Sequence, residues 1–214
     1  MSLEAEKISF QYENGGRRVL NQLSLSINEE DRIGLSAPSG FGKTTLCRIL
    51  AGYEKPDHGQ VRFDGQELPK LRGRLPIQLI WQHPEQAVNP RWRMRQVLRE
   101  GGGVDPELVK RLGIREEWLT RYPAELSGGE LQRFCIARAL GRGTRILLAD
   151  EITAMLDLVT QNEIWSVILE EADRRRIGML VVSHSERLLK QVCSRVIRPW
   201  ELQEQSEAGG RNGH

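Results

Sequence analysis

The chain has 214 residues, of which 39% are hydrophobic and 28% charged, so it is long enough to bury the core of one domain. Its net charge of +2 is too small to favour nucleic acid as a main partner, and we expect none. Three scattered cysteines, and no apolar run near the roughly 18 residues of a membrane span, predict a reduced cytoplasmic protein that crosses no membrane itself.

The first third of the chain carries several β-strand patterns. Residues 6–12 alternate apolar and polar side chains in the manner of an edge strand, and residues 19–27 are typical of a second strand after a turn at 13–16. A short strand is also predicted at residues 60–63, where the turn at 64–65 ends it. We expect these strands to form an antiparallel β subdomain.

A glycine-bearing loop at residues 37–45 separates a short apolar run at 32–36 from a helical run at 46–51. Strand, loop, Lys-Thr and helix is the context of a phosphate-binding P-loop, in which backbone N–H groups and the start of the helix face anionic oxygens. Lys43 would place positive charge near the β- and γ-phosphates, and the Thr44 hydroxyl would ligate Mg²⁺. The alternative is an ordinary glycine turn with Lys43 in solvent. The candidate nucleotide-binding residues of this loop are Ala37, Pro38, Ser39, Gly40, Phe41, Gly42, Lys43, Thr44 and Thr45.

One position of the loop departs from the pattern G-x-x-x-x-G-K-[ST]. Ala37 stands where the first glycine belongs, and Pro38 pushes the residue before it toward an extended backbone. An alanine tolerates that conformation, so we expect a functional loop with a slightly altered sequence.

Three later runs are short, continuous and apolar, and they are rich in residues that favour β-strands, as expected for strands buried on both faces of a parallel sheet. They lie at residues 77–81, 145–149 and 177–182. Polar residues end each run: Gln82, then Asp150 and Glu151, then Ser183 and His184. Open α/β sheets bind ligands at the carboxyl ends of their strands, so these side chains are expected to meet beside the P-loop.

Asp150 and Glu151 are adjacent carboxylates at the end of an apolar strand. Asp150 is the candidate for holding the Mg²⁺ shell, and Glu151 is the candidate for polarising a water that attacks the γ-phosphate. The alternative is a strand that simply ends in acidic residues. The P-loop makes that alternative the weaker interpretation.

The sequence pattern changes after Gln82: strand-like apolar runs stop, and amphipathic segments at 93–99 and 105–112 alternate with glycine and proline. We therefore predict a small helical subdomain over residues 84–139, within a nucleotide-binding core formed by residues 1–83 and 140–200. The polar, glycine-rich tail at 201–214 is predicted to be disordered.

The octet Leu-Ser-Gly-Gly-Glu-Leu-Gln-Arg at residues 126–133, which we call the signature segment, is the sharpest pattern. Ser127 is a predicted N-cap, and Gly128 and Gly129 leave backbone N–H groups open at the start of a helix. Taken alone, Ser-Gly-Gly is also a common structural cap. Followed twelve residues later by the strand at 145–149, the octet resembles the signature of the ATP-binding cassette (ABC) ATPases, and the resemblance covers roughly residues 4–200.

This resemblance implies an α/β P-loop NTPase fold with a RecA-like parallel sheet, and it implies ATP and Mg²⁺ as cofactors. Gln82 resembles the glutamine that contacts Mg²⁺ and the attacking water, and His184 resembles the histidine that holds the γ-phosphate. Tyr12 resembles the aromatic residue that stacks on adenine, and a half-buried strand tyrosine is the alternative.

The resemblance also implies a second cassette, because each ATP lies between the P-loop of one chain and the signature segment of another. Ser127, Gly128 and Gly129 would then bind the ATP of the partner. Asp157 resembles the residue of the D-loop that crosses to that partner, and it is a further candidate nucleotide-binding residue. Ile152, Ala154 and Met155 depart from the usual sequence of this loop.

Four stretches resemble the importer cassettes for oligopeptides and nickel, although the C-terminal extension with cysteines that is usual in that group is missing. The four stretches are residues 81–84, 89–91, 121–126 and 156–161. The resemblance implies two kinds of partner, transmembrane permease subunits and a substrate-binding protein. It also implies that this chain lies on the inner face of the plasma membrane, bound there through the permease.

The arginine-rich segment at residues 91–99 has three interpretations: a solvated helix face, a nucleic-acid patch, or a surface for a permease helix. The resemblance favours the last, with Trp92 and Met94 as apolar anchors. Two rivals to the transport function are a soluble ABC ATPase and a P-loop small-molecule kinase. The kinase would leave the signature segment and His184 unexplained.

Overall fold

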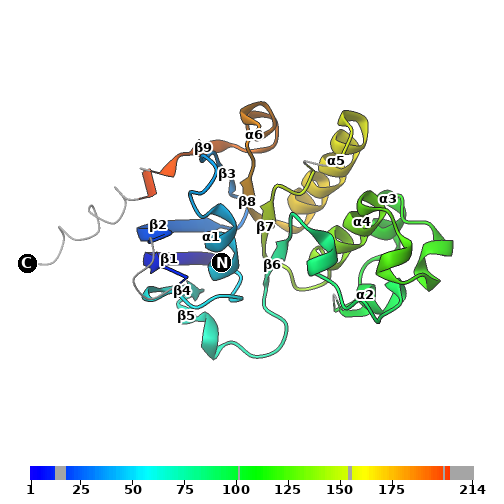
Figure 1. Ribbon diagram of the computed structural model, residues 1–214, viewed down its shortest axis with the longest axis horizontal. Coiled ribbons are helices and arrows are strands. Elements are labelled where there is room, and N and C mark those ends of the chain that lie inside the picture. Colours follow the sequence, from blue (N-terminus) through cyan, green and yellow to red (C-terminus); the bar gives the residue numbers. More distant parts are fainter. Residues whose placement is uncertain (13–17, 101, 154–155, 200, 203–214) are drawn as a thin grey trace, which may run out of the picture.

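Two β-sheets of different kinds organise the molecule, with a helical lobe beside them (Figure 1). The structure is a computed structural model that describes residues 1–12, 18–100, 102–153, 156–199 and 201–202. The predicted turn at 13–16 and nearly all of the predicted disordered tail lie outside these residues. No helix within the described ranges is long and apolar enough to span a membrane.

The larger sheet has five strands in the order β6-β7-β8-β3-β9, and every pair in it is parallel. The central strands β7 and β8 are buried along their whole length, which explains why their sequences are unbroken apolar runs. The predicted parallel α/β sheet is therefore confirmed. Its strands are β3 (Arg32–Leu35), β6 (Ile77–Ile80), β7 (Ile146–Asp150), β8 (Gly178–Val182) and β9 (Arg195–Ile197).

Helices α1, α5 and α6 each follow a strand of this sheet. Helix α1 (Lys43–Leu50) follows β3, helix α5 (Leu158–Arg175) joins β7 to β8, and helix α6 (Glu186–Val192) joins β8 to β9. Side chains of α1 pack with Leu148 and Leu180 on one face, whereas those of α5 pack with Leu147 and Val181 in the other hydrophobic cluster. The apolar strands are thus covered on both faces.

The smaller sheet is antiparallel, in the order β2-β1-β4-β5. The interpretation of residues 6–12 as an edge strand is wrong, because β1 lies between two partners: Leu3 is opposite Ile27 of β2 and also opposite Phe63 of β4. The polar positions alternate because one face of the sheet meets solvent, while the backbone of β1 pairs on both sides. The strands are β1 (Ser2–Phe10), β2 (Leu20–Asn28), β4 (His58–Phe63) and β5 (Gln66–Glu67).

The chain between β6 and β7 forms three α-helices, the green lobe of Figure 1, whose apolar side chains share one hydrophobic cluster with α5 and one face of the parallel sheet. Phe134 of α4 is fully buried there, beside Val97 of α2 and Leu108 of α3. The helices are α2 (Met94–Glu100), α3 (Pro106–Arg111) and α4 (Gly128–Ala139). Three 3-10 helices lie in the same stretch, η2 (Pro84–Gln86), η3 (Glu116–Thr120) and η4 (Pro123–Glu125), and a fourth, η1 (Leu68–Lys70), precedes β6.

Candidate active site

The predicted phosphate loop lies between β3 and α1, and two of its glycines have backbone conformations that other residues rarely adopt. Gly40 has φ 78° and Gly42 has φ 94°. A Cβ atom on Gly42 would also lie 2.5 Å from Cγ1 of Val19, so this position requires glycine for space as well as for conformation. Ala37 is buried and does not have a positive φ, so its methyl group fits without backbone strain.

Lys43, the first residue of α1, folds back over its own loop. Its Nζ donates hydrogen bonds to the carbonyl oxygens of Ala37 at 2.8 Å and Pro38 at 3.2 Å, and its side chain is buried. The alternative of a solvated Lys43 is therefore wrong. Nζ also lies 3.9 Å from Oε1 of Glu151, so the loop and the strand end form one charged site.

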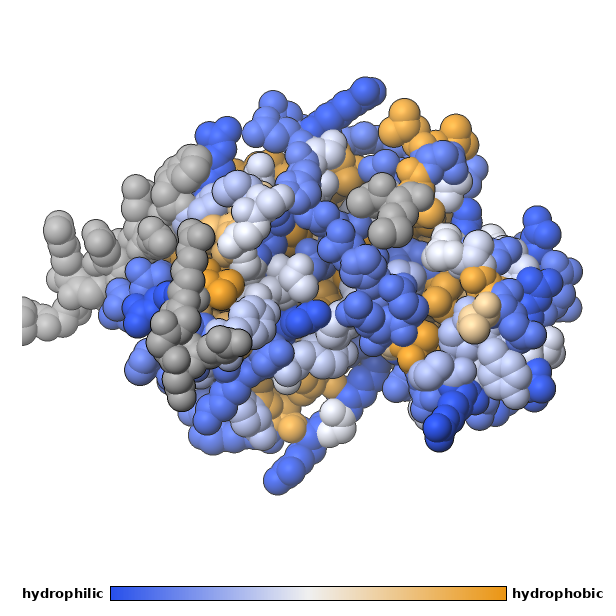
Figure 2. All heavy atoms as spheres, in the orientation of Figure 1, coloured by the Kyte–Doolittle hydropathy of each residue, from blue (hydrophilic) through white to orange (hydrophobic). Residues whose placement is uncertain are grey.

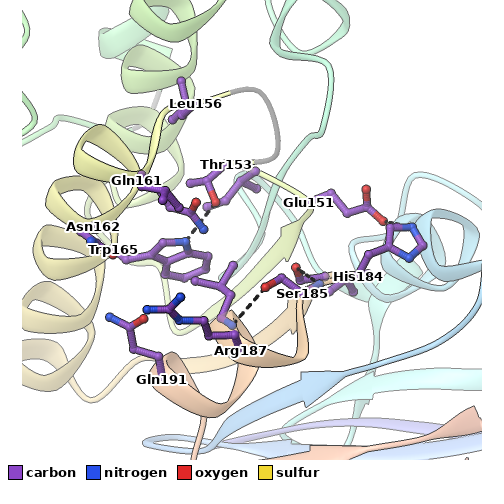
Figure 3. A pocket seen from close by; sticks show the side chains of 15 residues that line it. Glu151, Thr153, Leu156, Gln161, Asn162, Trp165, His184, Ser185, Arg187 and Gln191 are labelled. Carbon is purple, nitrogen blue, oxygen red and sulfur yellow. Dashed lines mark hydrogen bonds and ion pairs between the residues drawn. The ribbon is translucent and has the colours of Figure 1, made fainter.

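Three strand ends bring Gln82, Glu151 and His184 together. Nε2 of His184 lies 2.8 Å from Oε1 of Glu151, and Nε2 of Gln82 donates to Oε2 of Glu151 at 3.3 Å. Figure 3 shows the side chains of Glu151 and His184 pointing toward one another. Glu151 has φ 52°, a left-handed conformation that places its carboxylate among these partners at a cost in backbone strain.

Nε2 of His184 lies close to one negative and one positive group: the carboxylate of Glu151, described above, and Nζ of Lys43, which is 3.3 Å away. One ring nitrogen either donates to Glu151 or accepts from Lys43, but it does not do both. The shorter distance favours the Nε2–H tautomer, which donates to Glu151.

Asp150 ends β7 and is 2% exposed. Burial raises the pKa of its carboxyl above the usual range, while a hydrogen bond from the Thr44 hydroxyl acts in the opposite direction. This hydrogen bond places a hydroxyl and a carboxylate side by side. Such hard oxygen donors suit Mg²⁺, so these residues fit the predicted metal.

The signature segment begins α4, and Ser127 is its N-cap as predicted. Oγ of Ser127 accepts from the N–H of Glu130 at 3.3 Å, and the Glu130 carboxylate accepts from the N–H of Ser127 at 2.8 Å. Gly128 is exposed and has open space where a Cβ would lie, whereas a Cβ on Gly129 would lie 3.1 Å from Leu156.

Helix α4 and helix α1 pack into different hydrophobic clusters on the two faces of the parallel sheet. Figure 1 accordingly shows α4 in the lobe beyond β6 and β7, with α1 on the other side of these strands. Within one chain the signature segment and the P-loop therefore remain apart.

Asp157 is the N-cap of α5, a role that the sequence analysis missed. Its Oδ1 accepts from the N–H groups of Val159 and Thr160, each at 3.0 Å, and the Thr160 hydroxyl donates to Oδ2 at 2.7 Å. The hydrogen bonds from Thr160 are the main reason that the pKa of Asp157 is lowered. An aspartate just before an amphipathic helix was the available signal. The neighbouring D-loop positions Ala154 and Met155 lie outside the described residues.

Tyr12 follows the end of β1 and has 58% of its surface exposed, so the alternative of a half-buried strand tyrosine is wrong. Its hydroxyl lies 2.7 Å from Oγ1 of Thr45, and its ring meets Phe10 edge-on with centroids 5.0 Å apart. An exposed aromatic face therefore stands beside the P-loop helix.

A cavity of about 540 Å³ adjoins Glu151 and His184 between α5 and α6 (Figure 3). Nε1 of Trp165 donates there to Oγ1 of Thr153 at 3.2 Å, which ties the segment after Glu151 to α5. The sequence offered no signal for this contact, because a tryptophan in an amphipathic helix is also typical of an ordinary core.

Comparison with known proteins places this site in a family. The family model described as ABC transporter matches residues 20–154. The nickel import ATP-binding protein NikE of Rhodospirillum rubrum is 34% identical over 199 residues, which cover 85% of this chain and 72% of that protein. NikE of Escherichia coli strain K12 is 32% identical over 220 residues, covering 91% and 82%.

Solved structures agree with these sequence matches. The ATP-binding cassette MJ0796, described as a dimer in a post-hydrolysis state bound to ADP and Pi, matches with a TM-score of 0.79 and 25% identity, and the match covers 92% of this chain and 93% of that one. A protein described as the ATP-binding subunit of an ABC transporter matches in fold with a TM-score of 0.80 at 20% identity, covering 92% and 85%. The chain therefore belongs to the ABC transporter family, as one of its ATP-hydrolysing, ATP-binding cassettes.

Proposed function

We propose that this ATPase binds ATP with Mg²⁺ in a site that it shares with a second cassette, and that hydrolysis there powers import through separate permease subunits. The observation that carries the proposal is the meeting of Gln82, Glu151, His184 and Lys43 at the ends of three strands and the start of α1.

The P-loop residues 37–45 would hold the phosphates, with Lys43 as the nearest positive charge. In the structure Nζ of Lys43 donates to two carbonyl oxygens of its own loop, those of Ala37 and Pro38, which leaves one of its three donors for a phosphate oxygen. Thr44 and Asp150 would hold Mg²⁺ together with Gln82. When bound, the ion neutralises charge on the phosphate oxygens. The exposed ring of Tyr12 would stack on adenine.

Glu151 is proposed as the base that polarises the attacking water, and His184 as the residue that holds the γ-phosphate side of the site. The contact between them fixes the Glu151 carboxylate, and the Gln82 amide binds its second oxygen. A base must have its acceptor oxygens in a fixed position before the water arrives, and these two partners supply that position.

The second cassette is required in this proposal because Ser127, Gly128 and Gly129 begin α4, which packs on the opposite face of the sheet from the P-loop helix α1. Exposed apolar side chains follow Asp157: Leu158 is 74% and Val159 68% exposed. Figure 2 shows hydrophobic surface at this tip of α5, in the upper right of the view. Covering such a patch on association would stabilise the pair, since apolar burial is the main gain at interfaces.

We also propose that residues 84–139 act as a helical subdomain on the core formed by residues 1–83 and 140–200, and that the segment at 91–99 receives a permease helix. Met94 is not the apolar anchor that we expected, because it is fully buried in the helical lobe. Its place three residues before the buried Val97 puts it on the inner face of α2. Trp92 is half-buried and Arg95 is exposed, so these two remain available to a partner.

The relatives named as nickel import ATP-binding proteins support an importer of the nickel type. The four stretches that resemble oligopeptide and nickel importer cassettes extend the proposal to either substrate, with a permease in the membrane and a cytoplasmic position for this chain. The experiment that tests this substrate class is reconstitution of the chain with candidate permeases in vesicles. ATP-dependent uptake of nickel or of a peptide would support the proposal. A stable complex whose ATPase rate responds to neither substrate, in the presence of its binding protein, would refute the substrate class.

A further inference from the structure

The C-terminal end of α4, opposite its signature segment, is held by two arginines that belong to other elements. The last carbonyl groups of a helix have no N–H partner within the helix, and they carry partial negative charge. Arg74 reaches them from the loop before β6, and Arg175 reaches them from the last turn of α5. We call these two residues the arginine clamp.

Arg74 uses both of its terminal nitrogens. Nη2 donates to the carbonyl oxygens of Arg138 at 3.1 Å and Ala139 at 3.4 Å, and Nη1 donates to the carbonyl of Arg142 at 2.8 Å. Nη2 also lies 3.2 Å from Oγ1 of Thr144, which in turn donates to the carbonyl of Ala139 at 2.7 Å. The guanidinium therefore spans the last turn of α4 and the loop that follows it.

Arg175 holds the neighbouring carbonyl groups. Nη1 donates to the carbonyl of Leu140 at 2.5 Å, and Nη2 donates to those of Gly141 at 3.0 Å and Thr144 at 3.2 Å. Glu171, one turn earlier in α5 and only 2% exposed, accepts from Nη1 of Arg175 at 3.3 Å. The planar five-donor fork of arginine can make such a set of contacts, whereas the single ammonium of lysine cannot.

The same acidic residue also meets the helical lobe. Nη1 of Arg111, at the end of α3, lies 3.9 Å from Glu171, and its Nη2 lies 2.5 Å from Glu170. The end of α5 therefore contacts both α3 and α4. No other polar contact of comparable density joins the end of α4 to the core within the described residues.

A small error in angle at this end becomes a large displacement at the other. Helix α4 has 12 residues and is therefore about 18 Å long. A tilt of about 10° around its C-terminal end moves its N-terminal end by roughly 3 Å. Since displacements of about 1 Å can slow a positioned reaction by about a hundredfold, the signature segment tolerates little tilt.

We propose that Arg74 and Arg175 are positioning residues, which fix the angle of α4 against the core and thereby place Ser127, Gly128 and Gly129 for the ATP of the second cassette. This inference rests on the proposed function. The clamp touches neither the P-loop nor Glu151, and most of its hydrogen bonds go to the last turn of α4 and the loop that follows it.

The first test measures the position of the start of α4 relative to the core, without ATP and without a partner. Spin labels at the exposed positions Ala124, just before α4, and Ser26, on β2, report the distance between lobe and core, in a background where the half-buried Cys193 is replaced by serine. The parent is expected to show one narrow distance distribution. The double variant R74A/R175A is expected to show a distribution shifted or broadened by about 3 Å. An unchanged distribution overturns the proposal.

The second test separates positioning from stability. In R74A/R175A, ATP affinity at the P-loop is expected to stay within about twofold of the parent, while kcat falls by more than about tenfold. The matched control is Arg174→Ala, because Arg174 also pairs with Glu171 at 2.7 Å but makes no hydrogen bond to α4 in the described structure; it is expected to keep the parent kcat. Replacing Arg74 by lysine is expected to rescue only part of the loss.

Each remaining outcome counts against the clamp. A parallel fall in ATP affinity, kcat and Tm would show that the arginines only stabilise the fold, and an unchanged kcat would show that they position nothing. If the parent hydrolyses no ATP, the proposed function fails, but the spin-label distances still decide whether the two arginines fix the helix.

Discussion

Replacing Glu151 by glutamine tests the chemical assignment of the site most sharply. The amide keeps the size of the side chain but cannot act as a base toward water. A positioned general base contributes about 10² to 10⁴ in rate, so kcat is expected to fall by about that factor, equivalent to roughly 3 to 5 kcal/mol of transition-state free energy.

The surroundings of Glu151 indicate what the same change does to binding. Its carboxylate is 13% exposed, 3.9 Å from Nζ of Lys43, and it competes with phosphate for that charge. At an effective dielectric constant of about 20, two unit charges at this distance interact by about 4 kcal/mol before the losses of hydration are counted. Removing the carboxylate is therefore expected to leave ATP affinity unchanged or to raise it.

The assay pairs phosphate release at saturating ATP and Mg²⁺ with nucleotide binding measured by a fluorescent ATP analogue. The expected pattern is a loss of kcat with retained binding. Glu151→Gln turning over at the parent rate would refute the assignment of the base, and loss of binding would show that the carboxylate organises the pocket instead.

Three further predictions test other parts of the account. Ala37→Gly is expected to leave ATP affinity within about twofold and to lower the free energy of unfolding by about 0.4 to 1 kcal/mol, because glycine adds freedom to the unfolded chain; a large rise in affinity would show that the methyl group obstructs the loop. In the Glu151→Gln background, ATP is expected to shift the sedimentation of the chain from monomer to dimer. Ser127→Arg is expected to abolish that shift, because it places a bulky charge in the shared site. A shift that survives Ser127→Arg contradicts this interface. Arg95→Glu and Trp92→Ala are both expected to keep the ATPase activity of the isolated chain and to uncouple transport, and Trp92→Ala is also expected to lower the stability of the fold. If both variants transport at the parent rate while the complex is assembled, this surface is ruled out.

The strand ends could be predicted from sequence because a parallel sheet leaves little freedom. Each buried strand is a continuous apolar run, and the residue after the run must appear at the same edge as the P-loop. Gln82, Asp150, Glu151 and His184 were found in this way, and the structure places them at that edge. The kinase alternative is wrong, because the chain belongs to the ABC transporter family.

Two of the features that the sequence analysis missed depend on partners far away in the chain. The alternation in β1 gave the exposed face correctly but did not reveal that both of its edges are paired. The arginine clamp joins Arg74 and Arg175 to carbonyl groups 31 to 68 residues away, and any surface arginine has the same local pattern.

Met94 was a different kind of error. The arginines around it drew attention to the surface of α2, although its spacing from Val97 already indicated the inner face of a helix. Helical periodicity was the better guide here than the density of charge.

The most direct test of the central claim is the specific ATPase activity of the full chain as a function of its concentration, alone and mixed with a second cassette of its transporter. The P-loop begins α1 and the signature segment begins α4, and these helices pack on opposite faces of the sheet. The account therefore predicts Mg²⁺-dependent phosphate release whose specific activity rises with the concentration of the pair and is lost in Lys43→Ala. The shared site would be contradicted by a specific activity that stays constant when the protein is diluted a hundredfold, or by one that survives Lys43→Ala.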